Sequence, residues 1–595
     1  MSEPKKTIIL GISCFYHDAA AALLIDGKIV AAAQEERFTR IKHDENFPER
    51  AVDFCLKSQG LNIDDVNYVV FYDKPILKFE RLIQTYVKVW PKGLKSFLMA
   101  MRTWLKEKLW IEQTISKKLK FKGEILFTEH HYSHAASAYY CSDFDNATVV
   151  TIDGVGEWDT TTIGYGEGNK LKLTHSIHFP HSLGLLYSAL TYYLGFKVNS
   201  AEYKVMGLAP YGDPKKYEEA FRKLININDD GSFVLNMDHF AYEYGLTMTN
   251  KKFNELFGAT PRDPESELTQ KHKDIAASLQ KITEEIVLKI ARHAKNIYPS
   301  KNLCLAGGVA LNCVANGKIL KEGLFDNIYI QPASGDAGGA VGAAAYIYYD
   351  VLKNPKQKSV MPNAFLGPEF ENDNIKKFLE NKVIKNMGIT LCYEFIDENK
   401  IFYYAANLLA QDNVIGWFQG RMEFGPRALG GRSIIADARK KENWQRVNLK
   451  IKFRESFRPF APSILEEHSG EYFDLGGHPS PYMLLVARVK KDDIPAVTHV
   501  DGSARIQTIN REENHRYYDL LQEFYKLTGC PVIINTSFNV RGEPIVCTPE
   551  DAFNSFLNTD MDYLILQNYV ISKKDNPDIH KFKNTEKYLK EFKLD

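Results

Sequence analysis

Two histidines stand at helical spacing in the segment EHHYSHAASAYY, His130 and His134. The segment is rich in Ala and Thr128 is a candidate N-cap, so residues four apart should present both imidazoles on one helix face. Carboxylates come from two glycine loops, Asp153 in TIDGVGE and Asp336 in ASGDAGGA. Imidazole nitrogens combined with carboxylate oxygens suit a divalent transition metal such as iron, manganese or zinc. The ligand set does not choose among these metals, and a histidine pair alone can also be a core or surface pair.

The second half of the chain gathers basic side chains near glycines and small residues. They lie in QGRMEFGPRALGGRS, KFRESFRPFAP and VDGSARIQT, and comprise Arg421, Arg427, Arg432, Lys452, Arg454, Arg458 and Arg505. Their neighbours are apolar or turn-forming, which disfavours a solvated charged face, and guanidinium groups bind phosphate or carboxylate oxygens in two-point contacts. These residues predict an anionic substrate, and ion pairs with Glu423 and Glu455 are the structural alternative.

A buried strand in the same half of the chain leads into further polar groups. The apolar run 531–534 is followed by Asn535, Ser537 and Asn539 in NTSFN. A short apolar run of this kind is typical of a buried strand, whose end delivers these amides and this hydroxyl to one place. We expect them at the same anion-binding site.

Glycine loops organise the first half of the chain. Predicted strands at 7–13, 20–25 and 28–34 surround a loop with His17 and Asp18, and the plan returns at 147–152, 160–165 and 170–177. Two copies of one plan predict an internally duplicated domain. Glycines at strand ends let an anionic ligand approach backbone N–H groups. The candidate ligand-contacting residues in these loops are Gly154, Gly307, Gly308 and Asn312.

Length and composition limit the classes of protein to consider. The chain has 595 residues, above the ~250–300 at which single cores stop growing, so we expect several domains. Lys plus Arg and Asp plus Glu each total 75, and this zero net charge disfavours a general nucleic-acid binder. The eight Cys include no C-x-x-C pair, which disfavours a thiolate zinc site. The absence of a signal-like segment or a long apolar run leads us to expect a cytoplasmic protein without stable membrane insertion.

The pattern also predicts domain boundaries. Periodicity is lost in KNPKQKSVMP, so we place a linker there, between a first domain at 1–355 and a second at 363–572. The Lys-rich residues 573–595 form a tail in this interpretation. Within the first domain the stretch Lys78–Lys122 holds twelve Lys or Arg against three Glu, interleaved with Trp. Such a stretch suits a membrane surface or a partner, and equally a helix with a solvated basic face.

Nine motifs together resemble the NodU/CmcH type of carbamoyltransferase over nearly the whole chain. They are GISCFYHDAAAALLIDGKIVAAAQEERFTRIKHDENFP, HHYSHA, TIDGVGE, SAEYKVMGLAPYG, LAGGVALN, ASGDAGGA, GRMEFGPRALGGRSI, FRPFAPS and NTSFNVRGEPIV. The resemblance implies an α/β protein with a duplicated actin/hexokinase-like (ASKHA) N-terminal domain, akin to threonylcarbamoyl-transfer enzymes of tRNA modification. It implies a YrdC-like α/β domain at the C-terminus.

The resemblance also implies a two-step reaction. Carbamoyl phosphate and ATP, with Mg²⁺, form carbamoyl adenylate and pyrophosphate in the second domain, where Lys452 and Arg458 are the expected catalytic groups. Lys452 with Arg454 and Ser537 with Asn539 resemble the Lys, Arg, Ser, Asn signature of YrdC-like domains. The first domain then passes the carbamoyl group to an acceptor hydroxyl and releases AMP.

For this second step the resemblance places the metal ligands on His130, His134, Asp153 and Asp336, with iron as the first expectation and manganese or zinc as alternatives. His17 falls at the position of a catalytic group, where an imidazole of near-neutral pKa can act as general base. Lys204 is expected at the nucleotide and, with Glu202, at the border of the acceptor pocket.

Several alternatives remain at this stage. One is threonylcarbamoyl transfer to tRNA, which zero net charge disfavours. Hydrogenase-maturation carbamoyltransferases share the modules but carry C-x-x-C zinc fingers, which this chain lacks. An ASKHA sugar kinase and a non-catalytic nucleotide-binding module would explain the glycine loops, but not the histidine pair or the basic cluster. The acceptor is not named by the sequence, which leaves a sugar, an antibiotic or another metabolite, and a homodimer is expected from base rates alone.

Overall fold

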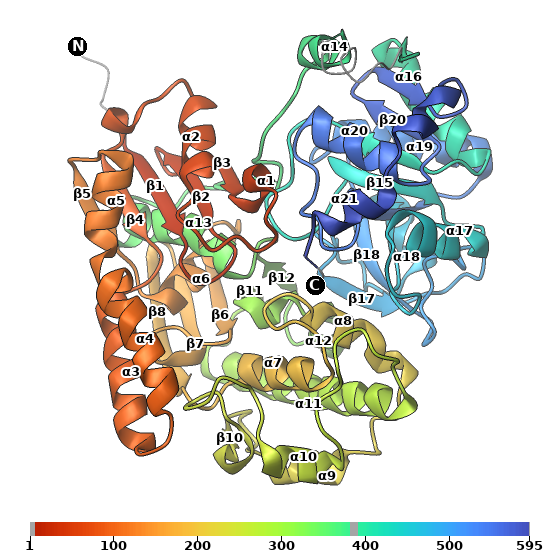
Figure 1. The fold of residues 1–595 in the computed structure, drawn as a ribbon. Helices are drawn as coiled ribbons and strands as arrows, with labels where there is room; N and C mark the ends of the chain where they lie inside the picture. Colours follow the sequence, from red (N-terminus) through yellow and green to blue (C-terminus); the bar gives the residue numbers. More distant parts are fainter. Residues whose placement is uncertain (1–5, 381–390, 594–595) are drawn as a thin grey trace. The chain divides into compact units, whose positions relative to one another are not determined.

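The computed structural model describes residues 6–380 and 391–593 (Figure 1). The chain forms two compact units. The first consists of Met1–Glu35 and His43–Pro362, and the second of Glu36–Lys42 and Asn363–Asp595. The short segment 36–42 therefore packs with residues that follow it by more than 300 positions, which the sequence did not indicate.

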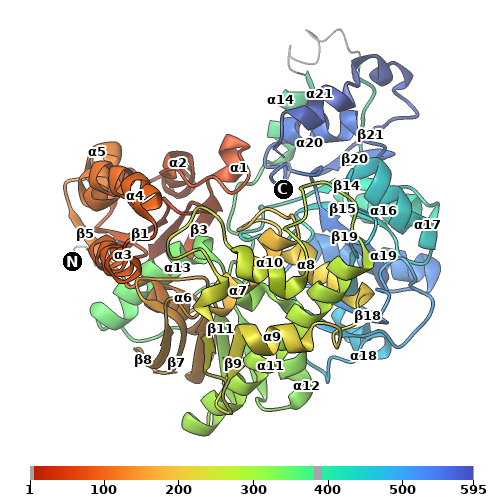
Figure 2. The same cartoon turned by 60° about the horizontal axis from the view of Figure 1, so that its bottom comes forward.

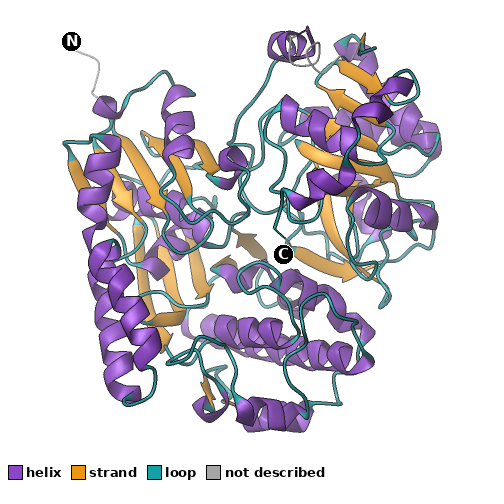
Figure 3. Ribbon diagram, in the orientation of Figure 1, coloured by secondary structure: helices purple, strands orange, loops and turns teal. Residues whose placement is uncertain are grey.

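The first unit contains two five-stranded sheets with the same plan (Figure 3). In each sheet three consecutive antiparallel strands are followed by two parallel ones. The first has the order β3-β2-β1-β4-β5, with β1 (Ile8–Ser13), β2 (Ala20–Ile25), β3 (Lys28–Gln34), β4 (Tyr68–Phe71) and β5 (Glu124–Phe127). The second has the order β8-β7-β6-β11-β12, with β6 (Asn146–Ile152), β7 (Asp159–Glu167), β8 (Lys170–His178), β11 (Asn302–Ala306) and β12 (Asn327–Ile330). The predicted duplication, and with it the actin/hexokinase-like class, is confirmed.

Helices α6 (His130–Tyr139) and α13 (Asp336–Tyr346) pack against each other, α13 also on β1 and β2 and α6 on β6 and β11. Their sequences, HHYSHAASAY and DAGGAVGAAAY, are built from small residues that let the backbones approach. A Cβ added at Gly342 would lie 1.7 Å from the carbonyl oxygen of Ser133, and one at Gly11 of β1 would lie 1.9 Å from that of Ala340. The glycines therefore fix how closely the two helices and the first sheet approach one another.

Other helices of the first unit surround these layers (Figure 2). They are α2 (Glu49–Lys57), α3 (Pro75–Val89), α4 (Leu94–Lys106), α5 (Ile111–Leu119), α7 (Leu183–Tyr193), α8 (Glu202–Leu208), α9 (Glu218–Leu224), α10 (Lys251–Phe257), α11 (Gln270–Ile297) and α12 (Cys313–Glu322). A two-stranded sheet joins β9 (Ile225–Ile227) and β10 (Phe233–Leu235). In both views α3 and α4 run side by side.

The second unit is built on a nine-stranded mixed sheet. Its order is β13-β21-β20-β14-β15-β19-β16-β18-β17, with β13 (Glu394–Phe395), β14 (Ile415–Phe418), β15 (Arg432–Asp437), β16 (Ala461–Leu465), β17 (Leu485–Arg488), β18 (Ser503–Ile509), β19 (Val532–Ser537), β20 (Tyr563–Leu566) and β21 (Tyr569–Ser572). Its helices are α1 (Glu36–Thr39), α14 (Asn372–Glu380), α16 (Glu398–Ala410), α17 (Lys441–Arg446), α18 (Ser469–Tyr472), α19 (His515–Thr528), α20 (Pro549–Asn558) and α21 (Thr585–Lys590). The α/β class expected for this half is confirmed.

The Lys-rich end of the chain differs from the expected tail. It contains α21, and Tyr588 of this helix is buried and donates a hydrogen bond to Glu543 over 2.8 Å. The helix is therefore docked on the second unit by a buried aromatic residue, which a composition rich in Lys conceals. Across the described residues, none of the helices combines the length and the apolar character that a bilayer span requires.

The close approach of α6 and α13 can be tested by substitution. We expect Gly342→Ala to destabilise the protein by about 3 kcal/mol, since a methyl group there overlaps a main-chain oxygen that cannot move freely. Gly470→Ala is the matched control, because a Cβ at that helical glycine would meet nothing within 4 Å. Thermal unfolding measures both variants. Equal melting temperatures for the two would contradict the packing described here.

Candidate metal centre and basic site

Four side chains converge in the first unit within 4.8 Å of one another: His130, His134, Asp153 and Asp336. The His130 Nε2 atom lies 3.0 Å from Asp153 Oδ2 and 3.2 Å from His134 Nε2. Asp336 Oδ1 lies 3.8 Å from Nε2 of each histidine. All four residues are buried. Ligand atoms about 2.0–2.2 Å from one ion lie roughly 3–3.6 Å apart, so this donor set and spacing fit a divalent transition metal.

Each carboxylate has one oxygen held by the protein and one turned to the histidines. Asp153 Oδ1 accepts a hydrogen bond from the Gly308 backbone over 2.8 Å, while Asp336 Oδ2 accepts one from the Tyr72 hydroxyl over 3.0 Å. Such outer contacts orient metal ligands and limit each carboxylate to one-oxygen binding. Neither partner was singled out as a ligand-orienting residue in the sequence, although Gly308 was expected at the nucleotide.

Local backbone geometry explains how these ligands are presented. The first turn of α6 has no side-chain cap, since its N-cap is Glu129 and not the expected Thr128. Instead, Glu157 from the loop after β6 accepts the His130 N–H with both oxygens at 3.1 Å. Gly307 adopts a φ of 90°, and a Cβ there would lie 2.3 Å from the Ile152 carbonyl oxygen. Only glycine permits the turn that brings the following N–H to the Asp153 carboxylate.

Two glycines next to the ligands border open space. A Cβ at Gly154 or at Gly335 would meet no atom within 4 Å, and these residues adjoin Asp153 and Asp336 in the chain. A ligand can therefore approach the backbone beside the cluster at these points. The contact of Gly154 with a nucleotide stays a prediction.

Two other residues expected at the nucleotide are engaged within the protein. Asn312 caps α12 by accepting the Ala315 N–H over 3.1 Å, and its side chain exchanges two hydrogen bonds with Gln280. Lys204 is completely buried, and Glu202, which we expected at an acceptor pocket, accepts the Ser188 hydroxyl over 2.9 Å. The Asn312 amide thus makes contacts within the protein, and its expected contact with a nucleotide stays a prediction.

His17 lies at the edge of the cluster. Its Nε2 atom is 3.7 Å from Asp336 Oδ2, its Nδ1 atom is 3.0 Å from Asp18 Oδ2, and the side chain is 32% exposed. Burial lowers its pKa, but the carboxylates of Asp336 and Asp18 outweigh burial and raise the pKa to about 10. The sequence led us to expect a near-neutral pKa for His17. With no cation on the cluster, the two carboxylates raise the pKa above that value.

The two ligand histidines have opposite pKa shifts. Burial and then the neighbouring His130 lower the pKa of His134 to about 4. For His130, burial and Lys78 lower the pKa, but the hydrogen bond to Asp153 and the charge of Asp336 outweigh them and raise it. The pKa of Asp153 itself is lowered, since its histidine contacts outweigh burial. The carboxylates thus favour the charged form of one imidazole, while burial and that neighbour favour the neutral form of the other.

The sheet of the second unit collects the predicted anion-binding residues at one edge. Phe418 at the end of β14 pairs with Arg432 at the start of β15, and Ser433 pairs with Ser537 at the end of β19. The loops after β14 and β19 therefore leave the same edge of the sheet. Antiparallel pairing produces this meeting because one strand ends where its neighbour begins.

Lys452 is buried where the loop after β19 begins. Its Nζ atom donates to the Ser537 and Asn539 carbonyl oxygens, over 2.6 and 2.7 Å, and to the Asn539 Oδ1 atom over 2.5 Å. Burial, followed by the charges of Arg454 and Arg458, lowers its pKa well below the ordinary value. The three predicted residues are therefore together, but the ammonium donors are already occupied by this loop.

A group of arginines surrounds Glu455 close to this lysine. Arg458 lies 3.6 Å from one oxygen of Glu455, and Arg541 lies 3.6 Å from the other. The Arg454 Nε atom donates to Asn448 over 2.7 Å. Arg541 was missed in the sequence although it stands in the motif NTSFNVRGEPIV, because no spacing rule links it to residues ninety positions earlier. Three guanidinium groups therefore lie in the segments that adjoin Lys452 and Glu455.

Three predicted anion-binding residues donate hydrogen bonds to acceptors within the protein, and their role in binding an anion stays a prediction. Arg432 is fully buried and donates to the main-chain oxygens of Gln419, Gly420, Gly431 and Pro368 at 2.9–3.1 Å. Arg421 donates to the Leu366 and Gly367 oxygens, and Asn535 is buried and donates to Gln507 over 2.7 Å. The residues next to them in the motifs did not indicate these hydrogen bonds, because most of the acceptors come from distant segments of the chain. Arg427 and Arg505 are half-buried, so they remain candidates for a substrate.

The expected ion pair between Glu423 and arginine is replaced by a backbone contact. Glu423 Oε1 accepts the N–H groups of Leu429, Gly431 and Arg432 at 2.6–3.1 Å. This carboxylate shapes the loop between β14 and β15. The glycines of GPRALGGRS are thus needed to turn the chain around Glu423, as well as to admit a ligand.

Segment 36–42 contacts the loop that follows β19 in the same unit. Arg40 donates to Glu543 over 2.8 Å and to the carbonyl oxygens of Ile545 and Pro544 over 2.7 and 2.9 Å. Phe38 packs against a buried cluster of Met422, Ile545 and Cys547. The loop that holds Lys452 therefore depends on residues from the N-terminal part of the chain.

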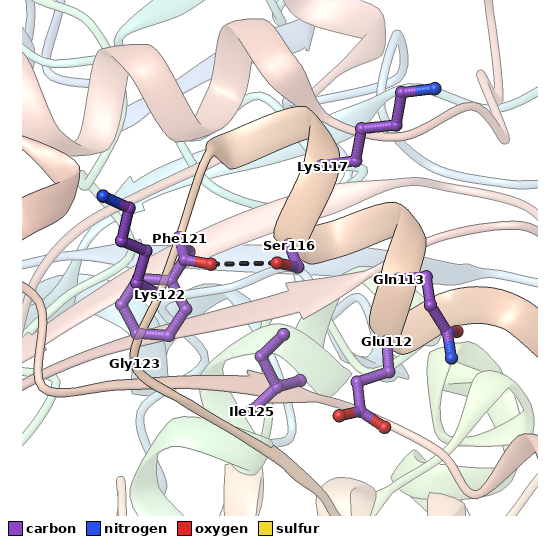
Figure 4. Close-up of a pocket in the computed structure, with 8 residues that line it drawn as sticks. All are labelled: Glu112, Gln113, Ser116, Lys117, Phe121, Lys122, Gly123 and Ile125. Carbon is purple, nitrogen blue, oxygen red and sulfur yellow. Dashed lines mark hydrogen bonds between the residues drawn. The ribbon is translucent and has the colours of Figure 1, made fainter.

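A separate hollow lies beside α5 and β5 (Figure 4). Ser116 and Phe121 are joined across it by a hydrogen bond of 3.0 Å, from the hydroxyl to the carbonyl oxygen. The hollow is lined by Glu112, Gln113, Ser116, Lys117, Phe121, Lys122, Gly123 and Ile125. One carboxylate and two lysines among these residues form neither a metal-ligand set nor an acid–base pair, so we assign the hollow no role.

Comparisons with known proteins cover both units. Two family models match, described as carbamoyltransferase N-terminus over residues 8–345 and carbamoyltransferase C-terminus over residues 406–573. An uncharacterized protein of Synechocystis sp. is 52% identical, covering 99% of this chain and all of that protein. The nodulation protein NolNO of Sinorhizobium fredii is 38% identical, covering 94% of this chain and 79% of that protein. The crystal structure of HypF from T. kodakarensis has a TM-score of 0.31 and 14% identity, covering 58% of this chain and 48% of that one.

The cluster predicts one tightly bound divalent metal ion per chain. We expect His134→Ala and Asp153→Asn each to lower metal affinity by ~10²-fold or more, because each removes a ligand from a buried set of four. His178→Ala is the control, since that histidine is exposed and pairs with Asp159 outside the cluster. Elemental analysis after equilibrium dialysis measures the metal content. Retention of a full metal equivalent by both ligand variants would refute the site.

Metal binding should also release a proton. The raised pKa of His130 keeps its ring protonated below that value, and a metal must displace this proton, so affinity is expected to rise with pH through that range. His134, with a pKa of about 4, is already neutral near pH 7 and adds no second proton. Calorimetry in buffers of different ionisation enthalpy measures the release. Zero release near pH 6, where His130 is charged, would contradict the assignment.

Proposed function

Because the chain belongs to the carbamoyltransferase family, we propose that it makes carbamoyl adenylate from carbamoyl phosphate and ATP and passes the carbamoyl group to a hydroxyl acceptor. The protein is a carbamoyltransferase, and the two-step route and its nucleotide are our proposal. The observation that carries it is the presence of two distinct sites in one chain. One is a buried His and Asp cluster, and the other is a strongly basic group around Lys452.

The basic site suits the first step. Carbamoyl phosphate and ATP are both anionic, so their reaction needs dense positive charge where the new anhydride forms. Arg458 and Arg541, which lie 3.6 Å from Glu455, and Arg454, which donates to Asn448, are the candidates to supply it. Lys452 contributes indirectly. Its donors are occupied by the Ser537 and Asn539 loop, so it holds that loop in position.

Atom balance defines the products of this step. The carbamoyl carbon must lose its phosphate before its oxygen can attack the α-phosphorus of ATP, so one water is consumed. Inorganic phosphate and pyrophosphate both leave, and the Mg²⁺ that accompanies ATP neutralises its phosphates. Carbamoyl adenylate then carries a carbamoyl group activated by an AMP leaving group.

The cluster suits the second step. The residues that would hold a divalent metal are His130, His134, Asp153 and Asp336, and the metal would polarise the carbamoyl adenylate as a Lewis acid. Iron is our first choice, with manganese or zinc as alternatives. His17 would take the proton of the acceptor hydroxyl, and its partial exposure at the edge of the cluster supports this role. A cation on Asp336 opposes the carboxylate that raises the pKa of His17, whereas burial continues to lower it. The acceptor oxygen then bonds to the carbamoyl carbon and AMP leaves.

The two steps should respond to different substitutions. We expect Arg458→Ala to lower carbamoyl-phosphate-dependent pyrophosphate release ~10²-fold or more while leaving transfer from supplied carbamoyl adenylate intact. We expect His17→Asn to lower the transfer of the carbamoyl group ~10²-fold or more while leaving pyrophosphate release intact. Released pyrophosphate, and AMP formed in the presence of hydroxyl compounds, report the two steps separately.

Matched controls and contrary outcomes are available. Arg511→Ala and His178→Asn remove exposed side chains paired with Asp519 and Asp159 and should change neither step. Equal loss of both steps in either test variant would contradict the division between the two sites. ADP as the product would favour a sugar kinase, and ATP binding without pyrophosphate release would favour a non-catalytic module. Product formation only with threonine, bicarbonate and tRNA would favour the tRNA-modifying reaction.

A further inference from the structure

The helices α3 and α4 carry a concentration of exposed apolar side chains. Of the 17 large exposed hydrophobic residues in the described chain, eight lie within the segment Ile76–Trp110. Trp90 is 66% exposed, Val87 72% and Leu98 59%. The others are Ile76, Leu94, Met99, Leu105 and Trp110. Soluble proteins rarely place so many large apolar groups together at the surface unless the surface is covered by something else.

These side chains are not needed to hold the helices together. The facing sides of α3 and α4 are packed by other aromatic residues, with Phe79 against Trp104 and Tyr86 against Phe97, at ring-centroid distances of 5.7 and 5.2 Å. The Ser96 hydroxyl, which is buried, donates to the Tyr244 carbonyl oxygen over 2.6 Å. The inner face is thus complete, and the exposed residues form a second, outer face.

The outer face is basic as well as apolar. Leu94, Leu98 and Leu105 are separated by four and seven residues in α4, so they share one stripe. The exposed charged residues of the segment are Lys88, Lys92, Lys95, Arg102 and Lys106 against Glu80 and Glu107. In the described part of the chain none of these five cations lies within ion-pair distance of a carboxylate. Their charges are therefore available to an outside partner.

We propose that the outer face of α3 and α4 docks on the surface of an anionic phospholipid bilayer. Exposed Trp and Leu side chains insert at the boundary between headgroups and acyl chains, while Lys and Arg contact lipid phosphates. With 15 and 13 residues, the helices are ~20 Å long and shorter than the ~30 Å bilayer core, so they lie on the membrane. A second copy of the chain is a poorer occupant, since pairing this face with itself brings like charges together.

This docking is independent of the carbamoyl chemistry, but the helices are fixed to the cluster loop. Arg81 of α3 donates to the Gly156 carbonyl oxygen over 2.9 Å, and the Lys74 N–H that precedes α3 donates to Glu157 over 2.8 Å. Glu157 is the residue that holds the first turn of α6. A membrane contact on α3 is thereby connected through two hydrogen-bonded residues to the loop beside the metal ligands.

Vesicle sedimentation with the full-length protein tests the proposal. We expect binding to phosphatidylcholine vesicles that contain phosphatidylglycerol, weaker binding at high salt, and little binding to phosphatidylcholine alone. Replacing Trp90, Leu94 and Leu98 together by Gln should weaken binding at least ~10-fold, because three insertions are lost. The matched control replaces Tyr403, Val500 and Leu527 by Gln, since these are exposed apolar residues elsewhere, and should bind as the unaltered protein does.

A charge variant separates the two contributions. Replacing Lys88, Lys92 and Lys95 by Gln should remove the preference for anionic vesicles while the apolar side chains remain. Unchanged melting temperature and metal content show that each variant is folded. The proposal is overturned if the unaltered protein does not sediment with anionic vesicles at low salt, or if the Trp90 variant and the control bind alike. It is also overturned if the face proves to mediate self-association that the Trp90 variant abolishes and that competes with vesicle binding.

Discussion

Close contact between two helices made of small residues is the constraint on which the first site depends. Gly342 of α13 leaves no room for a methyl group beside the Ser133 carbonyl oxygen of α6. His134 follows Ser133 directly, and Asp336 begins α13, so the backbone distance between the helices sets the distance between metal ligands. A larger residue would separate an imidazole from a carboxylate by more than one ion can bridge. We therefore expect the glycines to be as necessary to the proposed metal centre as its four candidate ligands are.

Burial then decides the electrostatics of the cluster. Two carboxylates in the interior need compensating positive charge, which a proton on His130 provides incompletely in the absence of a metal. The outer hydrogen bonds from Gly308 and Tyr72 hold each carboxylate by one oxygen and leave the other for a cation. His17 responds to the same charges, since Asp336 helps to raise its pKa. Its ability to accept a proton is thus linked to whether the cluster holds a metal.

Much of this site was predictable from local patterns. The four ligands could be found because two histidines at helical spacing and two aspartates in glycine loops are short-range signals, and the structure brings them together. The duplicated sheets followed from repeated strand and turn patterns, which also act over short distances. Tyr72 and Glu157 could not be found this way, because each reaches the cluster from a segment whose position is set only by the complete fold.

The basic site shows the opposite case. All seven basic residues of its motifs looked alike in sequence, yet Arg432 and Arg421 donate to main-chain oxygens, whereas Arg458 lies 3.6 Å from the Glu455 carboxylate. What distinguishes them is the supply of carbonyl acceptors from distant loops, and the sequence does not reveal it. Segment 36–42 adds a further hidden contact, as Arg40 holds the loop of Glu543.

The occupied donors of Lys452 lead to a general argument about that loop. An ammonium that donates to the Ser537 and Asn539 carbonyl oxygens fixes a backbone turn, and Arg40 fixes the same turn from its other side through Pro544 and Ile545. Two basic side chains hold this turn, so it can orient neighbouring side chains without moving during the reaction. Such fixed positions are the condition for electrostatic stabilisation of developing charge. In the proposed first step the role of Lys452 is therefore positional, and the charge that would meet phosphate comes from the arginines near Glu455. On this view Lys452 and the arginines beside it both serve the stabilisation of developing charge. Lys452 does so by fixing the backbone of the turn, and the arginines do so by supplying positive charge.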